Sequence, residues 1–397
     1  EVTRVFVRFI YRKTRSDILV GGLIVLKVLH FYRTYYPDSQ GGLEEAIRQI
    51  CLSTTPLGVE NRVLTLQRNT GDSTVVRPEA TVYRSPLHFS VASCDMSFSI
   101  LPLYKELLAW CDVVHYHFPW PFADMLELIA GGDKPYIVTY HSDIVRQKVL
   151  GQFYQPLMKY FLGGASRIVA TSQNYFASSP VLSIYSEKVD VIPLGISEES
   201  YPAVDSVVEY EMQAQYGQDF FLFVGVFRYY KGLHILLDAM KGAEYKVLVA
   251  GSGPVEGELR KQAQQLQLDN VVFTGFISDQ EKVALIKLSR AIVFPSYLRS
   301  EAFGMTLIEG AMLSRPLIST EVGTGTSHVN IDQETGMVVS PGSVKELREA
   351  MDFLYFQPQQ AEQMGRNARC RYENYFTGDI IGEQYMQLYN DVISEVR

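Results

Sequence analysis

Two glutamates, Glu301 and Glu309, stand eight positions apart around a segment that is expected to begin a helix. Residues 291–296 form an apolar run typical of a buried strand, and residues 303–313 place apolar side chains at helical spacing. Glu301 then lies in the loop before the helix, and Glu309 lies about two turns into it. The start of such a helix leaves free amide N–H groups at a strand end, which is a place that binds phosphate. Carboxylates on both sides of a phosphate site suit a ligand that also carries hydroxyl groups, as nucleotide sugars do.

The spacing of Glu301 and Glu309 resembles the E-x7-E signature of retaining glycosyltransferases of family 4, which have the GT-B fold. In that family the first glutamate binds hydroxyls of the donor sugar, and the second binds the ribose of the nucleotide. The resemblance implies that the diphosphate is bound by the backbone between them, at Phe303, Gly304, Met305 and Thr306. The alternative is a pair of ordinary surface glutamates on a helix.

Two basic residues, Arg228 and Lys231, follow another strand-like run and open the next helical segment. A diphosphate leaving group gains negative charge as the glycosidic bond breaks, and fixed cations stabilise that charge without a metal ion. By resemblance, these two residues bind the diphosphate; solvated surface cations are the alternative. The sequence contains no Asp-x-Asp pair, which metal-dependent GT-A transferases use to hold a divalent ion. We therefore expect metal-independent catalysis with no cofactor.

His141 follows an apolar run directly and resembles a strand-end histidine that faces the donor sugar in these enzymes. A neutral imidazole can bind a sugar hydroxyl or line the reaction face. A capping or core histidine is the alternative. His115 and His117 alternate along an earlier strand-like run and resemble the H-x-H of many relatives. We expect one of these two to face the cleft.

Glycines mark two further loops. Gly41 and Gly42 precede a helical segment, and glycines let backbone amides approach a ligand closely. The resemblance places this loop beside the donor phosphates and the acceptor, although a plain loop-to-helix junction has the same pattern. Gly253 lies in a Gly-Ser-Gly-Pro loop whose glycine spacing departs from the dinucleotide fingerprint. It is similar to the G-x-G-P loop that this family commonly has near the nucleotide base.

Apolar strand-like runs alternate with helical patterns over most of the 397 residues, which predicts an α/β protein with parallel sheets. The runs are residues 27–31, 61–66, 113–116, 136–139, 167–171, 189–192, 220–224, 246–250, 271–274, 291–295 and 316–320. The length indicates two domains. We predict the GT-B architecture, in which two Rossmann-like domains face each other across a cleft. The expected divisions are residues 23–195, residues 196–376, and a final helix over 377–397 that crosses back to the first domain.

The composition limits the classes of function. A net charge of −8 argues against a nucleic-acid-binding surface over the whole protein. Four separated cysteines without a C-x-x-C pair indicate buried thiols in the cytoplasm. Residues 1–22 carry arginines at helical spacing among apolar residues, a pattern of membrane-surface helices. We therefore expect a cytoplasmic protein with peripheral contact at the inner face of the cytoplasmic membrane; an upstream segment unrelated to the fold is the alternative.

The resemblance implies a retaining hexosyltransferase in which the departing phosphate helps to deprotonate the acceptor hydroxyl. The protein then positions the donor and stabilises charge. Residues 28–42 look like bacterial O-antigen and polysaccharide mannosyltransferases, so we expect GDP-mannose as donor and a lipid-linked saccharide as acceptor. UDP-glucose, UDP-galactose and UDP-N-acetylglucosamine are the alternative donors. Two other classes are a GT-B-fold sugar-nucleotide epimerase and a nucleotide-sugar-binding protein without catalysis.

Overall fold

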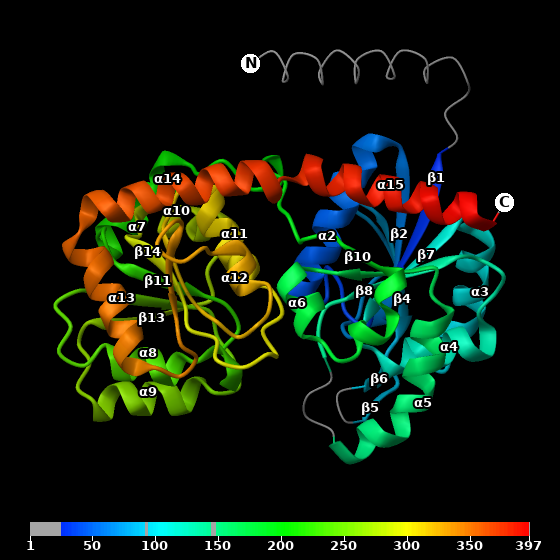
Figure 1. Ribbon diagram of the computed structural model, residues 1–397, viewed down its shortest axis with the longest axis horizontal. Helices are drawn as coiled ribbons and strands as arrows, with labels where there is room; N and C mark the ends of the chain where they lie inside the picture. The colour runs from blue at the N-terminus through cyan, green and yellow to red at the C-terminus, as the bar shows by residue number, and fades with distance from the viewer. Residues whose placement is uncertain (1–24, 92–93, 144–147, 397) are drawn as a thin grey trace, which may run out of the picture.

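The computed structural model of the chain describes residues 25–91, 94–143 and 148–396. These residues form two lobes that lie side by side, each built on a sheet with helices on its faces (Figure 1). The predictions made for residues 1–22, including membrane contact, lie outside the described residues. Within the described part of the chain, no helix combines the length and the apolar character needed to cross a membrane.

The N-terminal lobe contains, in its described residues, an eight-stranded sheet of order β10-β9-β8-β7-β1-β2-β4-β3. Neighbouring strands run parallel, except that β3 pairs antiparallel with β4. The strands are β1 (Leu26–Phe31), β2 (Val59–Gln67), β3 (Thr74–Val76), β4 (Thr81–Pro86), β7 (Val113–Phe118), β8 (Tyr136–Tyr140), β9 (Arg167–Ala170) and β10 (Val189–Val191). A separate hairpin pairs β5 (Phe89–Val91) with β6 (Cys94–Met96). All six residues of β7 are buried, as expected for a parallel strand covered on both faces.

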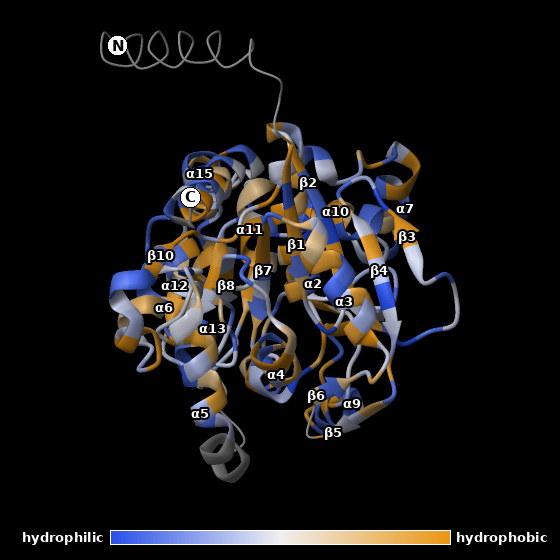
Figure 2. Cartoon of the chain, turned by 90° about the vertical axis from the view of Figure 1, so that its right-hand side faces the viewer, coloured by the Kyte–Doolittle hydropathy of each residue, from blue (hydrophilic) through white to orange (hydrophobic). Residues whose placement is uncertain are grey.

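Helices cover both faces of this sheet, and alternate residues of β1 show the two faces. Leu29 packs into a core with the helix α3 (Ile100–Trp110). Val28 packs with Ile50 of α2 (Gly42–Thr54) and with Tyr385 of α15 (Gly378–Val396). In Figure 2 the hydrophobic residues, drawn in orange, gather on the strands and on the inner sides of the helices. The helices of this lobe are α2 (Gly42–Thr54), α3 (Ile100–Trp110), α4 (Pro121–Ala130), α5 (Lys148–Gly164) and α6 (Gln173–Ser178), with α15 (Gly378–Val396) added from the end of the chain.

The C-terminal lobe contains a parallel sheet of order β13-β12-β11-β14-β15-β16. Its strands are β11 (Phe221–Val224), β12 (Val247–Ala250), β13 (Val271–Gly275), β14 (Ala291–Phe294), β15 (Leu317–Thr320) and β16 (Gly336–Val339). Its helices are α7 (Ser206–Tyr216), α8 (Leu233–Ala239), α9 (Glu256–Gln265), α10 (Asp279–Leu288), α11 (Met305–Met312), α12 (Thr326–Val329), α13 (Val344–Phe356) and α14 (Pro358–Tyr375), with the short 3-10 helix η4 (Tyr229–Lys231) after β11.

The chain passes between the lobes at two points that lie next to each other. Ile196 in the first crossing donates its N–H to Phe376 O at 2.8 Å, and Gly378 N donates to Ile196 O at 3.0 Å. After the second crossing, α15 lies across the N-terminal lobe, shown in red in Figure 1. The two crossings are therefore joined by backbone hydrogen bonds where the lobes meet.

Two expectations need correction. The helix predicted over residues 303–313 begins later, at Met305, because Gly304 has a left-handed backbone that ends the preceding loop. The cysteines were expected to be buried thiols, and Cys51 and Cys111 are buried. Cys94 is half-buried and Cys370 is exposed on α14. All four are free, so the fold does not depend on a disulfide among them.

Candidate active site

The start of α11 lies at the carboxyl ends of the central strands of the C-terminal lobe. Gly304 has φ +97°, and a β-carbon at this position would lie 3.0 Å from the ring of Phe294 in β14. Thr306 Oγ1 donates to Val224 O at 3.2 Å, which ties the first turn of the helix to the end of β11. The Phe303 ring is buried beside Phe376, so this residue offers a ligand its backbone only. The free N–H groups of the first turn of α11 therefore sit at a strand-end position suited to an anion.

Glu301 and Lys231, which come from separate motifs, are in direct contact. Lys231 Nζ donates to Glu301 Oε2, and Ser296 Oγ donates to the same oxygen at 3.0 Å. The Lys231 and Glu301 side chains are 14% and 10% exposed, so water screens this pair weakly. The main chain of Glu301 is held as well, because Thr324 Oγ1 donates to its carbonyl oxygen at 2.7 Å. A cation and a carboxylate thus stand together just before α11.

Glu309, the second glutamate of the pair, lies within α11 and is buried. Its Oε1 accepts hydrogen bonds from Tyr201 OH at 2.6 Å and from Lys282 Nζ at 2.8 Å. Burial alone would lower the pKa of Lys282, but the charge and hydrogen bond of Glu309 raise that pKa above its ordinary value. Burial, followed by the charge of Glu309, raises the pKa of Tyr201 well above its usual range. An open cavity of about 710 Å³ adjoins these residues and is lined in part by Tyr201 and Asp279.

Arg228 and Gly253 lie on two adjoining loops of the C-terminal lobe. Arg228 is exposed, and it forms no ion pair with another residue that the structure describes. Phe227 N donates to Ser252 O at 2.8 Å, and a β-carbon on Gly253 would lie 2.5 Å from Phe227 O. Gly253 therefore has no room for a side chain, and its loop packs against the loop that carries Arg228.

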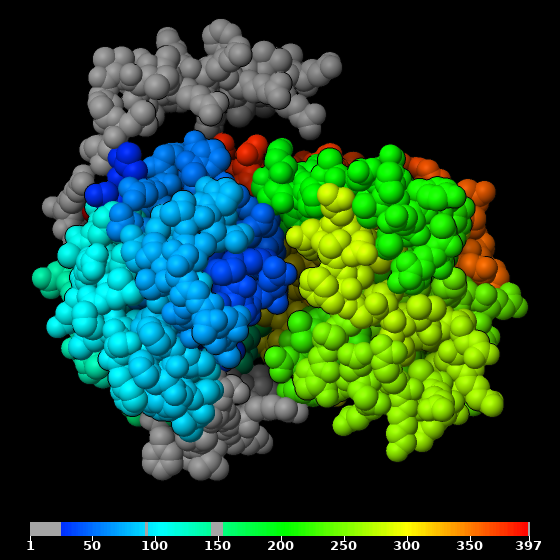
Figure 3. Space-filling view, turned by 180° about the vertical axis from the view of Figure 1, so that it is seen from behind, coloured from blue at the N-terminus to red at the C-terminus, as the bar shows by residue number. Residues whose placement is uncertain are grey.

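The glycine loop of the N-terminal lobe faces the start of α11. A β-carbon on Gly42 would lie 4.0 Å from Met305 Cγ, so the first turn of α2 and the first turn of α11 meet across the boundary between the lobes. Gly41 precedes α2 in extended conformation, and a β-carbon there would lie 2.7 Å from Glu44 Oε2. Figure 3 shows the boundary between the two lobes as a narrow groove in the surface.

A set of polar contacts joins the lobes next to the two predicted sugar-binding residues. Arg299 lies two residues before Glu301, and Asp143 lies two residues after His141. Arg299 pairs with Asp143 Oδ2 at 3.4 Å and donates to Ser178 Oγ at 3.0 Å. We call these bonds the Arg299 contact. They connect the loop of His141 in one lobe with the loop of Glu301 in the other.

His141 ends β8 and is buried. Burial lowers its pKa to about 3, so the ring is neutral at physiological pH. Its Nε2 lies 3.0 Å from His117 Nδ1. The prediction that His115 or His117 faces the cleft is wrong, because they are 0% and 2% exposed and both nitrogens of each ring bind other residues of the lobe.

The structure adds residues that sequence reasoning missed. Ser296 lies two residues after the end of β14, which is a detectable signal, and Lys282 follows the capping box at the start of α10. Tyr201 lies in the segment between the lobes and carries no pattern that would identify it. The structure brings together Glu301 with Lys231, the start of α11 with Gly42, and the loop of Arg228 with that of Gly253. Glu309 contacts Tyr201 and Lys282, which were not predicted, and His141 lies in the opposite lobe.

Comparison with known proteins finds relatives that match most of the chain. The D-rhamnosyltransferase WbpZ of Pseudomonas aeruginosa is 50% identical over 352 residues, covering 89% of this chain and 92% of that protein. The chain belongs to the group 1, family 4 glycosyltransferases. Family models described as "Glycosyltransferase Family 4" and "Glycosyl transferases group 1" match residues 40–200 and 211–371. The O-antigen chain mannosyltransferase C of Escherichia coli is 44% identical over 368 residues, covering 93% of this chain and 99% of that protein.

Solved structures identify the fold. Sucrose-phosphate synthase from Thermosynechococcus elongatus superposes with a TM-score of 0.76 at 21% identity, covering 93% of this chain and all of that chain. Anabaena Alr3699/HepE in complex with UDP gives a TM-score of 0.72 at 17% identity, covering 92% and 100%. The predicted GT-B fold is thereby confirmed.

Proposed function

We propose that this glycosyltransferase transfers mannose from GDP-mannose to a lipid-linked saccharide, with retention of configuration and without a metal ion. The contact between Lys231 and Glu301 at the start of α11 carries this proposal, because it combines a phosphate-binding cation with a hydroxyl-binding carboxylate. The relationship to an O-antigen mannosyltransferase supports mannose as the sugar. Residues 1–22 are our candidate for contact with the inner face of the cytoplasmic membrane, where a lipid-linked acceptor would be presented.

A second donor has a specific observation in its favour. The relative with 50% identity is a D-rhamnosyltransferase, and D-rhamnose is mannose that lacks the hydroxyl at C6. Both relatives therefore use sugars of the same ring configuration, which favours a mannose-type donor over glucose or galactose. The choice between GDP-mannose and GDP-D-rhamnose depends on the residues that contact C6 of the donor sugar.

The residues of this chain supply positioning and charge stabilisation. Lys231, Arg228 and the first-turn amides of α11 would bind the diphosphate and stabilise the charge that develops as it leaves. Glu301 would accept hydrogen bonds from hydroxyls of the sugar, and Glu309 from the ribose. The leaving phosphate would take the proton of the acceptor hydroxyl on the same face of the sugar, which gives retention without a protein nucleophile.

The test is a donor panel with a lipid-linked saccharide acceptor, comparing GDP-mannose, GDP-D-rhamnose, UDP-glucose, UDP-galactose and UDP-N-acetylglucosamine. We expect turnover with GDP-mannose, an α-linked product by NMR, and no loss of rate when EDTA is added. Preference for GDP-D-rhamnose would support the second donor. Preference for a UDP sugar, a β-linked product, or loss of activity in EDTA that added Mg²⁺ restores would contradict the proposal.

An epimerase is distinguished by omitting the acceptor. Conversion of the nucleotide sugar into its epimer under that condition would replace the transferase proposal.

A further inference from the structure

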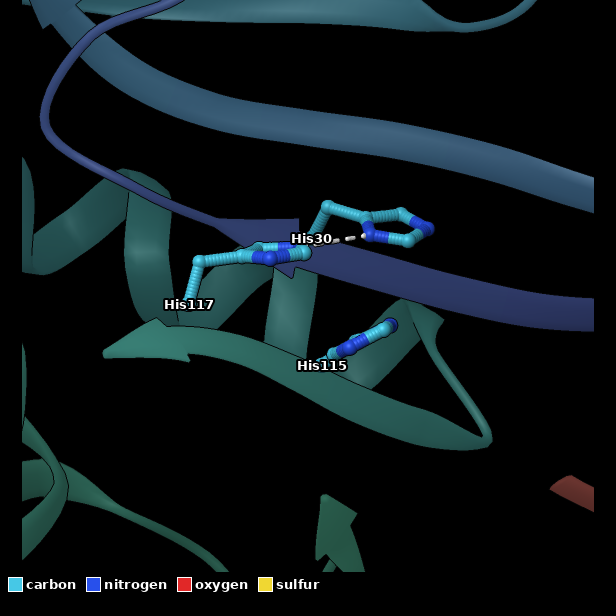
Figure 4. Close-up of side chains that lie close together, drawn as sticks. All are labelled: His30, His115 and His117. Atoms are coloured by element: carbon cyan, nitrogen blue, oxygen red, sulfur yellow. Dashed lines mark hydrogen bonds between the residues drawn. The ribbon is translucent and has the colours of Figure 1, made fainter. Parts of the chain in front are cut away.

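A row of buried polar side chains crosses the N-terminal sheet beneath the loop of His141. His30 in β1, His117 in β7 and His141 after β8 lie on the same face of neighbouring strands, and Asn61 in β2 extends the row. Consecutive members are in hydrogen-bond contact: Asn61 Oδ1 with His30 Nε2 at 3.2 Å, His30 Nδ1 with His117 Nε2 at 3.1 Å, and His117 Nδ1 with His141 Nε2 at 3.0 Å. Figure 4 shows the bond between His30 and His117, with His115 beside them. We call these four residues the histidine row.

Asn61 sets the direction of every hydrogen bond in the row. Its Nδ2 lies 3.2 Å from Cys51 O, a carbonyl that can only accept, and 3.1 Å from the hydroxyls of Thr54 and Thr55. Those hydroxyls donate their own protons to backbone carbonyls, so they accept from Asn61. The amide nitrogen must therefore point this way, which directs Oδ1, an acceptor, at His30.

The remaining assignments follow from neutral rings. Burial lowers the pKa of His30 to about 4, and the pKa of His117 also falls well below its ordinary value. A neutral imidazole has one donor and one acceptor nitrogen. His30 donates from Nε2 to Asn61 and so accepts at Nδ1; His117 donates from Nε2 to His30 and so accepts at Nδ1. His141 must then donate from Nε2, which leaves its Nδ1 as an acceptor.

We propose that Asn61, His30 and His117 are positioning residues that fix His141 in the Nε2–H tautomer, so that its Nδ1 accepts a hydrogen bond from a hydroxyl of the donor sugar. Among the residues that the structure describes, none bonds to His141 Nδ1. Donation by a hydroxyl to this nitrogen distinguishes a sugar that has the hydroxyl from a deoxy sugar that lacks it. The consequence for activity rests on the proposed function, whereas the tautomer does not.

The same cluster could instead bind a metal ion, because nitrogen atoms of His30, His115 and His117 lie within 4.8 Å of one another. The hydrogen bonds favour the row. Both nitrogens of each ring already have protein partners, with His115 bound to Tyr389 OH at 2.9 Å and to Thr139 Oγ1 at 2.7 Å. A metal would have to displace at least one of these bonds from each ring.

Two substitutions of matched shape test the proposal. His117→Gln keeps the pattern, because the Gln amide can donate to His30 and its oxygen can accept from His141. His117→Met has similar length and can do neither. The tautomer of His141 is read by long-range ¹H–¹⁵N NMR of ¹⁵N-histidine-labelled full-length protein without substrate.

We expect the Nε2–H form of His141 in the wild type and in His117→Gln, and a mixture or the Nδ1–H form in His117→Met. With the active donor, we expect kcat/KM to fall about 2- to 10-fold in His117→Met, the effect of one neutral hydrogen bond, and to recover in His117→Gln. An Nδ1–H form in the wild type, the same tautomer in both variants, or one equivalent of tightly bound metal would overturn the proposal. If His117→Met does not fold, the wild-type spectrum alone decides. If no donor turns over, the proposed function fails while the NMR result stands by itself.

Discussion

Replacing Lys231 by methionine should lower both the free energy of unfolding and kcat, and the two effects can be measured separately. Glu301 Oε2 accepts from Lys231 Nζ and from Ser296 Oγ. Without the lysine, a carboxylate that is about nine-tenths buried would keep only a neutral hydroxyl as partner. Removing one partner of a buried ion pair costs about 3–5 kcal/mol. Because both side chains retain some exposure, we expect the lower end, about 3 kcal/mol of unfolding free energy.

A double-mutant cycle isolates the pair. Adding Glu301→Gln to Lys231→Met removes the unpaired charge, so the double variant should regain about 2 kcal/mol relative to the Lys231→Met variant. Urea unfolding can localise the loss, because both tryptophans, Trp110 and Trp120, lie in the N-terminal lobe. Far-UV circular dichroism reports on both lobes, whereas tryptophan fluorescence reports on the N-terminal lobe only. We expect the variants to shift the circular dichroism transition more than the fluorescence transition.

Catalysis gives the second measurement. If Lys231 stabilises the leaving diphosphate, its loss should lower kcat by about 100- to 1,000-fold, as for removal of one preorganised donor. The control is Lys282→Met, which breaks the comparable pair with Glu309 in the middle of α11. That variant should lose similar stability but mainly weaken nucleotide binding, seen by calorimetry with GDP. Additive effects in the cycle within about 0.5 kcal/mol, or unchanged kcat in Lys231→Met, would refute the reasoning.

The contact between the lobes, the left-handed glycine and the buried histidines each give a further test. Arg299→Met removes a partly exposed ion pair between the lobes, so the free energy of unfolding should change by less than about 1 kcal/mol. Calorimetry should show donor binding weakened about 2- to 5-fold. Full wild-type affinity would argue against a role of Arg299 in donor binding. Gly304→Ala forces a side chain into a left-handed backbone and should cost about 1–3 kcal/mol in urea unfolding, with Gly132→Ala, where a β-carbon meets open space, as a near-neutral control. Burial lowers the pKa of His30 to about 4 and of His141 to about 3 in the folded protein, whereas a histidine in the unfolded chain has a pKa of about 6.5. Below about pH 6.5 the unfolded chain therefore binds protons that the folded protein does not. The free energy of unfolding is full above about pH 6.5 and falls as the pH drops toward the folded pKa values. Each ring should contribute about 1.4 kcal/mol per pH unit in that window, and urea midpoints that stay constant between pH 6.5 and 4 would contradict this.

Most of the strands that sequence patterns found are largely buried, although β10 and β13, at the edges of the two sheets, are half-buried and were found as well. All eleven predicted runs match strands within two residues at each end, because a short, continuous apolar run in an α/β chain is typical of a strand covered by helices on both sides. The pattern missed β3 and β4 at one edge of the N-terminal sheet, β16 at one edge of the C-terminal sheet, and the hairpin of β5 and β6. These strands are short or partly exposed, so their side chains carry less apolar signal than those of β7.

The positions of site residues could be predicted from the sequence where one short motif fixes them. They could not be predicted where the site forms only after separate strands or the two lobes pack together. The position of Glu301 before α11 follows from local spacing. The partners of Glu309 do not, because Tyr201 comes from the segment between the lobes and Lys282 from another helix. The histidine row was invisible for a related reason. It depends on the order β8-β7-β1-β2, and that order is set by crossover connections and not by the residues of any single strand.

The Arg299 contact links the position of His141 to that of Glu301. His141 and Glu301 belong to different lobes, yet each is two residues away from a member of the same ion pair. The distance between the two predicted sugar-binding residues is therefore tied to the relative position of the lobes. A substitution that separates the lobes moves His141 away from Glu301 even when both remain intact. A donor that bridges the two residues would, by the same linkage, bind most tightly to the arrangement in which Arg299 and Asp143 are paired.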